Sequence, residues 1–379
     1  MEQKSGLGAL NLGLLHEYGK GVPQNFATAE ELYRQAAGKG MPHAMYRLGV
    51  MYQNGEGVRR DDVAAAKWFY EAAKLGHADA QSELGYMFYN GLGTKQDYQN
   101  AFAWYIQAAQ AGVVFAESSV ASMYERGEGV KQDEAEAVAW FRRAADQNDP
   151  FAMTQLAVHF RQGSGVPWSE AEAMQWFRKA ADQGYASAET SLGYGYMAGL
   201  GQGAGQGQQD YRQAAYWFDL AARQGEGYAQ LNLAILYEKG WGVSQDLQKA
   251  KGLYLQAARS PIPEVANNAK ELVSTGPFAV SGPSTPSASP LSRQRENSSD
   301  WVEPVIGIGL VIGGAWALAN LLSGPSTSTH DAAPTTGGTA QQSDYKDYVA
   351  DAIQNNIARK QLRAKLLLRK IVYVVNAMW

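Results

Sequence analysis

The sequence contains no cysteine among its 379 residues. This absence excludes a disulfide framework, a thiolate metal site and a cysteine nucleophile, so the folded chain must be stabilised by packing alone. Histidine is scarce as well, with five residues, and no two of them have the spacing of four that places both imidazoles on one face of a helix. The sequence therefore gives no indication of a metal site, and we expect no cofactor.

The chain also lacks a strong charge of one sign, because 33 basic and 37 acidic residues leave a net charge of −4. Residues 343–379 hold seven Lys or Arg against three Asp, a net charge of +4, so the remainder carries −8. An acidic repeat region predicts no nucleic-acid partner, whereas the short basic end favours an anionic surface or partner. Residues 1–10 lack the charged and then apolar pattern of a signal peptide.

What the sequence has instead is an internal repeat of 36 residues. A Leu-Gly-like pair marks the period, and its first residues are Leu12, Leu48, Leu84, Val120, Leu156 and Leu192. A seventh copy, at Leu233, comes five residues late. A fixed period in this range indicates that one supersecondary unit is stacked on copies of itself, each burying its apolar face against its neighbours.

The first half of each repeat predicts an amphipathic helix, which we call helix A. In the second copy, Ala44, Leu48, Met51 and Tyr52 recur at the spacing of one helical face. Two glycines follow, at positions where a turn needs conformations that other residues adopt only with strain. These pairs are Gly19/Gly21, Gly55/Gly57, Gly91/Gly93, Gly127/Gly129, Gly163/Gly165, Gly199/Gly201 and Gly240/Gly242.

The second half predicts another helix, helix B, which starts after a residue able to cap it. The seven predicted N-caps are Asn25, Asp61, Asp97, Asp133, Ser169, Asp210 and Asp246. Helix B then repeats small alanines beside one large ring, and we expect that ring to be buried in every repeat. The rings in this phase are Trp68, Trp104, Trp140, Trp176 and Trp217.

These features predict an all-α fold, a right-handed α-solenoid of about seven helix-turn-helix repeats over residues 6–274. Pro263 begins a final half-repeat that we expect to cap the last interface. The solenoid would resemble the superhelix of tetratricopeptide repeats.

The recurring pattern Ala-x3-Leu-Gly-x2-Tyr-x2-Gly-x-Gly-Val-x2-Asp-x3-Ala-x2-Trp-x3-Ala-Ala-x2-Gly resembles the Sel-one-like repeat family, relatives of the tetratricopeptide repeats. The resemblance covers roughly residues 6–274, and its Gly-x-Gly turn and Trp-x3-Ala-Ala block recur together in register. The resemblance implies an adaptor solenoid of signalling, secretion-linked or envelope complexes, often bacterial.

Beyond the repeats the composition changes twice. Residues 275–300 are rich in Pro and Ser and predict a linker. Residues 304–322 then run without a charge, close to the length that spans a bilayer, and we interpret them as a transmembrane helix. The alternative is an apolar, glycine-rich helix buried against protein, because four glycines in this stretch weaken the preference for a membrane.

The end of the chain leaves several interpretations open. Residues 323–343 predict a second low-complexity linker, and residues 344–379 a basic amphipathic tail for a membrane surface or a partner. A disordered end, or a strand near residues 371–375, fits the tail as well. The sparse charges around residues 304–322 favour a single membrane pass with cytoplasmic repeats, but a basic tail on the same side would instead require a hairpin or a surface helix.

No nucleophile, general base or metal ligand set is arranged for catalysis, and the aspartates already serve as helix caps, so we expect no enzymatic activity. A binding surface is expected instead on helix A, at phases that the repeat does not fix, where solenoids bind extended peptides. The candidate partner-binding residues are Arg47, Val50, Glu83, Tyr86, Ser122, Gln155, Val158 and Tyr194.

The function predicted from the sequence is a non-enzymatic, membrane-tethered adaptor that presents the concave helix A surface to a protein or peptide partner. The alternative is an exported or envelope-associated factor whose apolar segment and basic tail act on membranes, with the repeats as a recognition arm. A hydrolase, sometimes claimed for cysteine-rich relatives of the family, has little support because this chain lacks their cysteines.

Overall fold

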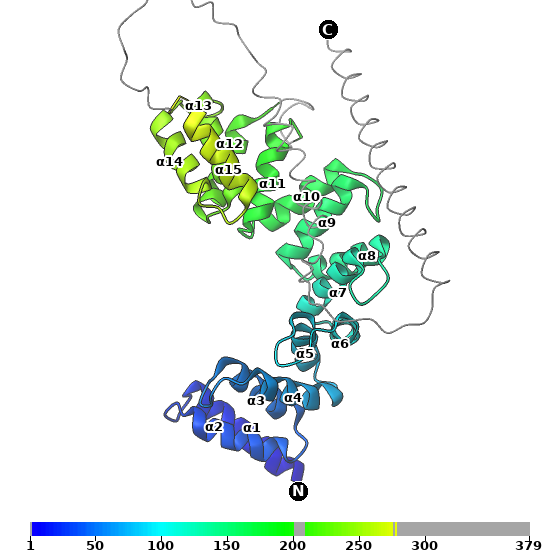
Figure 1. Ribbon diagram of the computed structural model, residues 1–379. Helices are drawn as coiled ribbons and strands as arrows, with labels where there is room; N and C mark the ends of the chain where they lie inside the picture. The colour runs from blue at the N-terminus through cyan, green and yellow to red at the C-terminus, as the bar shows by residue number, and fades with distance from the viewer. Residues whose placement is uncertain (1, 201–208, 276, 279–379) are drawn as a thin grey trace, which may run out of the picture. The chain divides into compact units, whose positions relative to one another are not determined.

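The computed structural model describes residues 2–200, 209–275 and 277–278 (Figure 1), and every regular element among them is an α-helix. The helices are α1 (Glu2–Tyr18), α2 (Phe26–Ala37), α3 (Pro42–Asn54), α4 (Asp62–Lys74), α5 (Ala78–Asn90), α6 (Tyr98–Gln110), α7 (Val114–Arg126), α8 (Glu134–Asp146), α9 (Pro150–Gln162), α10 (Glu170–Ala181), α11 (Ala186–Met197), α12 (Tyr211–Arg223), α13 (Gly227–Lys239), α14 (Leu247–Ala257) and α15 (Pro263–Thr275). The predicted all-α solenoid class is confirmed for these residues.

Successive helices form the repeats, since each helix packs against the next one along the chain. The odd-numbered helices from α1 to α13 are the A helices, and the even-numbered ones from α2 to α14 are the B helices. The last helix, α15, contacts both α13 and α14 and buries Val265 and Ala269 there. It therefore covers the end of the final pair.

The seven predicted N-caps are confirmed, because each accepts a side-chain hydrogen bond from a backbone N–H in the first turn of its helix B. The cap also closes the turn through its own backbone. The N–H of Asp61 donates to the carbonyl of Tyr52 at 2.9 Å, and the other six caps repeat this bond with the matching residue of their own helix A. One residue thus fixes both the start of helix B and its position against helix A.

In a turn such as the one between α7 and α8, the two glycines are required for different reasons. The first, such as Gly127 with φ of 70°, ends helix A in the left-handed region, where other residues are strained. The second, such as Gly129, has a positive φ too, and a Cβ added to it would lie 2.0 Å from the carbonyl oxygen of Tyr98 in the preceding repeat. The second glycine therefore permits the close approach of neighbouring repeats.

The prediction that every tryptophan of helix B is buried is wrong. Trp176 and Trp217 are buried, but Trp68, Trp104 and Trp140 are only half-buried. The fully enclosed ring is the next residue along helix B, and these core rings are Tyr33, Phe69, Tyr105, Phe141, Phe177, Phe218 and Tyr254. One residue turns a helical side chain by about 100°, so the tryptophan lies at the edge of the face that its neighbour buries.

Several core rings pack directly on the glycine of the Leu-Gly pair. A Cβ on Gly49 would lie 2.5 Å from the ring of Phe69, and one on Gly85 would lie 2.8 Å from that of Tyr105. The missing side chain lets helix A and helix B of one repeat approach closely. The Leu of the pair is buried from Leu48 onward, whereas Leu12 on the first described helix is exposed.

None of the helices in the described residues is both long enough and apolar enough to cross a membrane. The predicted linkers at 275–300 and 323–343, the apolar segment 304–322 and the basic tail 344–379 lie outside the described residues, apart from positions 275, 277 and 278.

Candidate functional site

The A helices from α5 to α13 carry two hollows that share one side chain. We call them the first groove, over α5, α7 and the start of α9, and the second groove, over α9, α11 and the start of α13. Their volumes are about 390 Å³ and about 270 Å³. Phe151 lines both grooves, so the two are neighbours along the solenoid.

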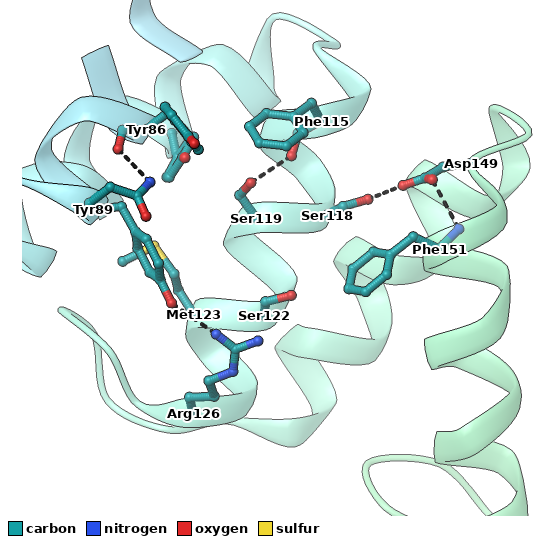
Figure 2. A pocket seen from close by; sticks show the side chains of 12 residues that line it. Tyr86, Tyr89, Phe115, Ser118, Ser119, Ser122, Met123, Arg126, Asp149 and Phe151 are labelled. Atoms are coloured by element: carbon teal, nitrogen blue, oxygen red, sulfur yellow. Dashed lines mark hydrogen bonds between the residues drawn. The ribbon is translucent and has the colours of Figure 1, made fainter. Parts of the chain in front are cut away.

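The first groove is walled by aromatic rings (Figure 2). Phe115 on α7 is 56% exposed and Tyr86 on α5 is 38% exposed, with ring centroids 6.4 Å apart at an angle of 61°. Phe115 also meets the edge of the core ring Tyr105, at 6.2 Å. Large rings left in solvent beside a hollow are typical of a binding surface rather than of a core.

The polar side chains of the first groove are already bonded to one another. Arg126 donates to the hydroxyl of Tyr89 at 2.9 Å, and this hydroxyl donates to Glu128 at 2.7 Å. Burial, with the bond to Glu128 as a second cause, raises the pKa of Tyr89 to about 12. Asp149 accepts from the hydroxyl of Ser118 and from the backbone N–H of Phe151. The groove is therefore an apolar space between an Arg126 side and an Asp149 side.

The second groove is aromatic as well, but its lining contains one charged side chain only. Its rings are Phe151, Tyr185, Tyr194 and Tyr228, and the charge is the carboxylate of Glu226. Burial raises the pKa of Tyr228 to about 12, helped by the carboxylates of Glu264 and Glu226.

Hydrogen bonds from neighbouring helices fix the position of the Glu226 carboxylate. Its Oε2 caps α13 by accepting from the N–H of Ala229 at 2.6 Å, and it accepts from the hydroxyl of Thr190 at 3.1 Å. Burial raises the pKa of Glu226, and the hydrogen bonds oppose that rise. Among the described residues, no Lys, Arg or His forms an ion pair with it.

Seven consecutive segments of the chain match one family model, described as the Sel1 repeat. They are residues 7–41, 42–77, 78–113, 114–149, 150–185, 186–226 and 227–261. This chain belongs to the Sel1 repeat family. Sel1 repeats build scaffolds for protein–protein interaction, and the solenoid fold supports this general function.

Two solved structures of Sel1 repeat proteins are similar to this chain at 33% identity. One is a protective antigen of uropathogenic Escherichia coli with an SLR fold, which has a TM-score of 0.64 and covers 73% of this chain. The chain spans 58% of that antigen. The other, a Sel1 repeat protein of Oxalobacter formigenes, has a TM-score of 0.58 and covers 70% of this chain, which spans 76% of it. A search of curated proteins finds no match.

The eight residues predicted to bind a partner lie on five successive A helices of the Sel1 repeats, α3 to α11. Tyr86 and Ser122 line the first groove, and Gln155, Val158 and Tyr194 line the second. Arg47, Val50 and Glu83 line neither groove. Their role in binding stays a prediction.

Several of the eight are engaged in internal contacts, among them Val50 and Val158, which pack against the core. Arg47 pairs with the buried carboxylate of Glu17, and Glu83 accepts from the side chain of Gln53 at 3.3 Å. Ser122 is buried on the floor of the first groove. Tyr194 is 8% exposed, accepts from Asn232 at 2.8 Å and meets the core ring Phe218 edge-on. Truncating Tyr194 would therefore damage the core as well as the groove.

The sequence reasoning missed the residues that dominate the grooves. Phe115, Phe151 and Tyr228 occupy the same place in their repeats, the second position of an A helix, where His43, Asp79 and Ser187 stand in the others. A change of residue type at one repeat position is the signal that was available, because constant positions pack the core and variable ones face outward.

A pair of histidines was also missed. His43 Nδ1 lies 3.2 Å from His77 Nε2, and Tyr46 stacks on His77 with centroids 4.7 Å apart. His77 caps α5, accepting at Nδ1 from the N–H of Ala80. The accepting Nδ1 leaves the proton of the neutral ring on Nε2, which therefore donates to His43. Within the described residues, no three His, Asp or Glu gather closely enough to hold a metal ion.

Proposed function

We propose that this chain is a non-enzymatic adaptor that holds an extended segment of a protein partner in the first and second grooves. The observation that supports this most is the exposure of Phe115 and Tyr86 beside an apolar hollow on an A helix face. Exposed apolar area of this kind is stabilised when a partner covers it. The residues that the repeat holds constant serve as caps, turns and core, which leaves the groove side chains for recognition.

The proposal includes a membrane tether at residues 304–322, with the repeats on the cytoplasmic side. Its support is the uncharged run in the sequence and the basic residues that precede it. Removing residues 304–322 should move the chain from the membrane fraction to the soluble fraction. Protease protection of a tag placed after Trp379 tests the orientation: a tag cleaved from outside the cell supports a single pass, and a protected tag supports a hairpin or a surface helix.

Site-specific crosslinking tests the adaptor function. A photoreactive amino acid at Ser119, on the rim of the first groove, should crosslink the full chain to one partner in cells. The change Phe115→Ser should remove the crosslink. The matched control is Tyr216→Ser, because Tyr216 is equally exposed but lies on the B helix α12. Equal crosslinking by the chain and its Phe115→Ser variant would contradict the proposed surface.

One observation favours a second function. The Escherichia coli relative is a protective antigen present in uropathogenic strains. In this alternative, the chain is exported or associated with the envelope, residues 304–322 and the basic tail act on membranes, and the repeats serve as a recognition arm. Leakage of anionic liposomes caused by the full chain, and abolished by removing residues 301–379, would support it. A truncated chain that still captures its partner, without leakage by either form, would support the adaptor.

A further inference from the structure

The second groove combines aromatic walls with an acidic group that has no cationic partner. Two buried acidic side chains of the A helices are paired with cations, Glu117 with Arg143 at 3.0 Å and Glu238 with Lys239 at 2.6 Å, whereas the buried Glu189 of α11 accepts from the amide of Gln224 at 2.9 Å. Glu226, the N-cap of α13, accepts hydrogen bonds from neutral groups, among them Thr190 and Ala229. An ionised carboxylate that is partly withdrawn from water is stabilised by any cation that reaches it.

From this carboxylate without an ion pair, in a groove lined by aromatic rings, we infer that the second groove binds the Lys or Arg side chain of a partner segment whose adjacent bulky apolar residue fills the first groove. This inference rests on the proposed function and names the chemistry of its partner. The occupant is a protein segment that carries both a basic and an apolar anchor.

The walls of the second groove suit a cation. Tyr194 and Tyr228 form buried walls, Tyr185 and Phe151 half-buried ones, and all four line the same groove as Glu226. The faces of such rings attract ammonium and guanidinium groups, and most strongly where water is excluded. The long apolar stem of Lys or Arg also packs against rings, while its charged end reaches the carboxylate.

The electric field in the second groove has one sign. Within the part of the chain that the structure describes, no Lys, Arg or His lines it, and the carboxylates of Glu264 and Glu226 add to the effect of burial in raising the pKa of Tyr228. A partner carboxylate placed there would be repelled by both of these carboxylates and would find no lining cation among the described residues to pair with. The second groove therefore discriminates against acidic segments as well as favouring basic ones.

The first groove differs from the second in the charge of its lining. Its carboxylate, Asp149, accepts from a hydroxyl and a backbone N–H just as Glu226 does, but the first groove also contains a cation, Arg126, which repels a second positive charge. What remains is the exposed apolar surface of Phe115 and Tyr86, which an aromatic or branched aliphatic side chain would cover. Because Phe151 is the shared wall, the two anchors belong to neighbouring parts of one segment.

Peptide selection on the full-length chain tests the inference. The probe is a library of random peptides displayed on phage and selected on the immobilised, unaltered protein. Each peptide has twelve residues and is about 40 Å long when extended. We expect the selected peptides to share a Lys or Arg at a fixed distance from a bulky apolar residue. Selected peptides without a basic residue, which nevertheless lose binding to the Phe115→Ser variant, would overturn the inference and leave the adaptor standing. A library from which no peptide is selected would overturn both.

A double-mutant cycle then locates the charge contact. Glu226→Gln keeps an oxygen that can cap α13 but removes the charge, and it should weaken the selected peptide about 10- to 100-fold. Replacing the basic residue of the peptide by Met should weaken binding to the unaltered chain by a similar factor. In the Glu226→Gln variant, the same change in the peptide should weaken binding by less than about threefold. If the two changes together weaken binding by the product of their separate factors, the assignment of the cation to Glu226 is overturned.

Two controls complete the test. Asp146→Asn removes an equal charge from an exposed position on the B helix α8, and it should change the affinity by less than about twofold. The second control does not depend on the folding of any variant: a peptide with Glu in place of its basic residue should bind the unaltered chain at least about 100-fold more weakly. Tolerance of that Glu would overturn the inference.

Discussion

Gly93 lies against the backbone of Asp62, so closely that a Cβ on Gly93 would be 2.0 Å from the Asp62 carbonyl oxygen. Gly93 belongs to the turn after α5, and Asp62 begins helix α4 of the preceding repeat. The contact is between backbones, and it holds two repeats together at a point where no side chain fits.

Replacing Gly93 by Ala should therefore destabilise the solenoid more than the same change at Gly76. Both glycines have a positive φ, 64° and 80°, but Gly76 has nothing within 4 Å of an added Cβ. Gly76→Ala should lower the free energy of unfolding by about 1 kcal/mol, and Gly93→Ala by about 3 kcal/mol or more because the neighbouring repeat must move. Urea unfolding followed by circular dichroism measures both; equal losses would show that the contact is not limiting.

The hydroxyl of Tyr33 should contribute measurably to the first repeat. It donates to the buried carboxylate of Glu17, which Arg47 also reaches. Tyr33→Phe should lower the free energy of unfolding by about 1 to 3 kcal/mol, because a buried carboxylate loses a hydrogen bond. The control is Tyr216→Phe at an exposed position, which should leave the melting temperature unchanged.

The last repeat provides an independent repetition of that experiment. Tyr254 donates to Glu238 at 2.9 Å, and the two residues are 16 positions apart, as are Tyr33 and Glu17. Tyr254→Phe should therefore destabilise the chain as Tyr33→Phe does. A loss in one variant only would mean that the shared geometry is not the cause.

The stability of the second and third repeats should decrease in mild acid. Burial lowers the pKa of His77, as does the neighbouring His43, while Asp79 opposes the shift. The folded pKa thus lies below the ordinary value of 6.5, and the unfolded chain binds the proton more readily. The contribution of His77 is complete above the unfolded value of 6.5 and is lost as the pH falls from there through the lower folded pKa. Protonation at Nδ1 also removes the cap on α5.

Melting temperatures between about pH 7.5 and about pH 5.5 measure this dependence. His77→Asn retains a capping oxygen without a titrating group, so the variant should lose less stability over that range than the unaltered chain. His43→Asn should reduce the pH dependence as well, because it removes the neighbouring imidazole. Identical pH profiles for the chain and the His77→Asn variant would contradict the assignment.

Asn148 offers a local test of backbone strain. It has a φ of 67°, the one positive value outside glycine in the described residues, at the place where the next repeat has Gly184. Asparagine tolerates this conformation better than alanine does. Asn148→Ala should lower the melting temperature by an amount equivalent to about 1 kcal/mol, whereas Asn148→Gly should be neutral or stabilising within about 0.5 kcal/mol. A stabilising alanine would contradict this account.

The sequence sufficed to predict the features that local chemistry decides. Asp61 caps α4 because its side chain reaches N–H groups two and three residues ahead, and Gly55 ends α3 because the turn needs its positive φ. These relations lie within a few residues and recur at each period. The repeat count and the all-helical class follow from them.

Depth of burial could not be predicted in the same way, because it depends on the neighbouring repeat. Tyr86 and Tyr194 occupy the same phase of an A helix, yet Tyr86 is exposed whereas Asn232 of α13 bonds to Tyr194. His43 and His77 are 34 positions apart, close to one period, so their contact becomes visible only when two repeats are aligned start to start. The second groove likewise joins three A helices, and a single repeat contains none of its geometry.

The joints between repeats have one further consequence. At Gly93, Gly129, Gly165 and Gly242 the atoms approached most closely are backbone atoms of Asp62, Tyr98, Glu134 and Tyr211, two acidic residues and two tyrosines. At these four junctions the close contact is made to the main chain, so it does not depend on which side chain the opposite residue carries. Whole modules can be duplicated or exchanged by recombination without redesigning the seam, while the outward-facing positions remain free to diverge toward new ligands.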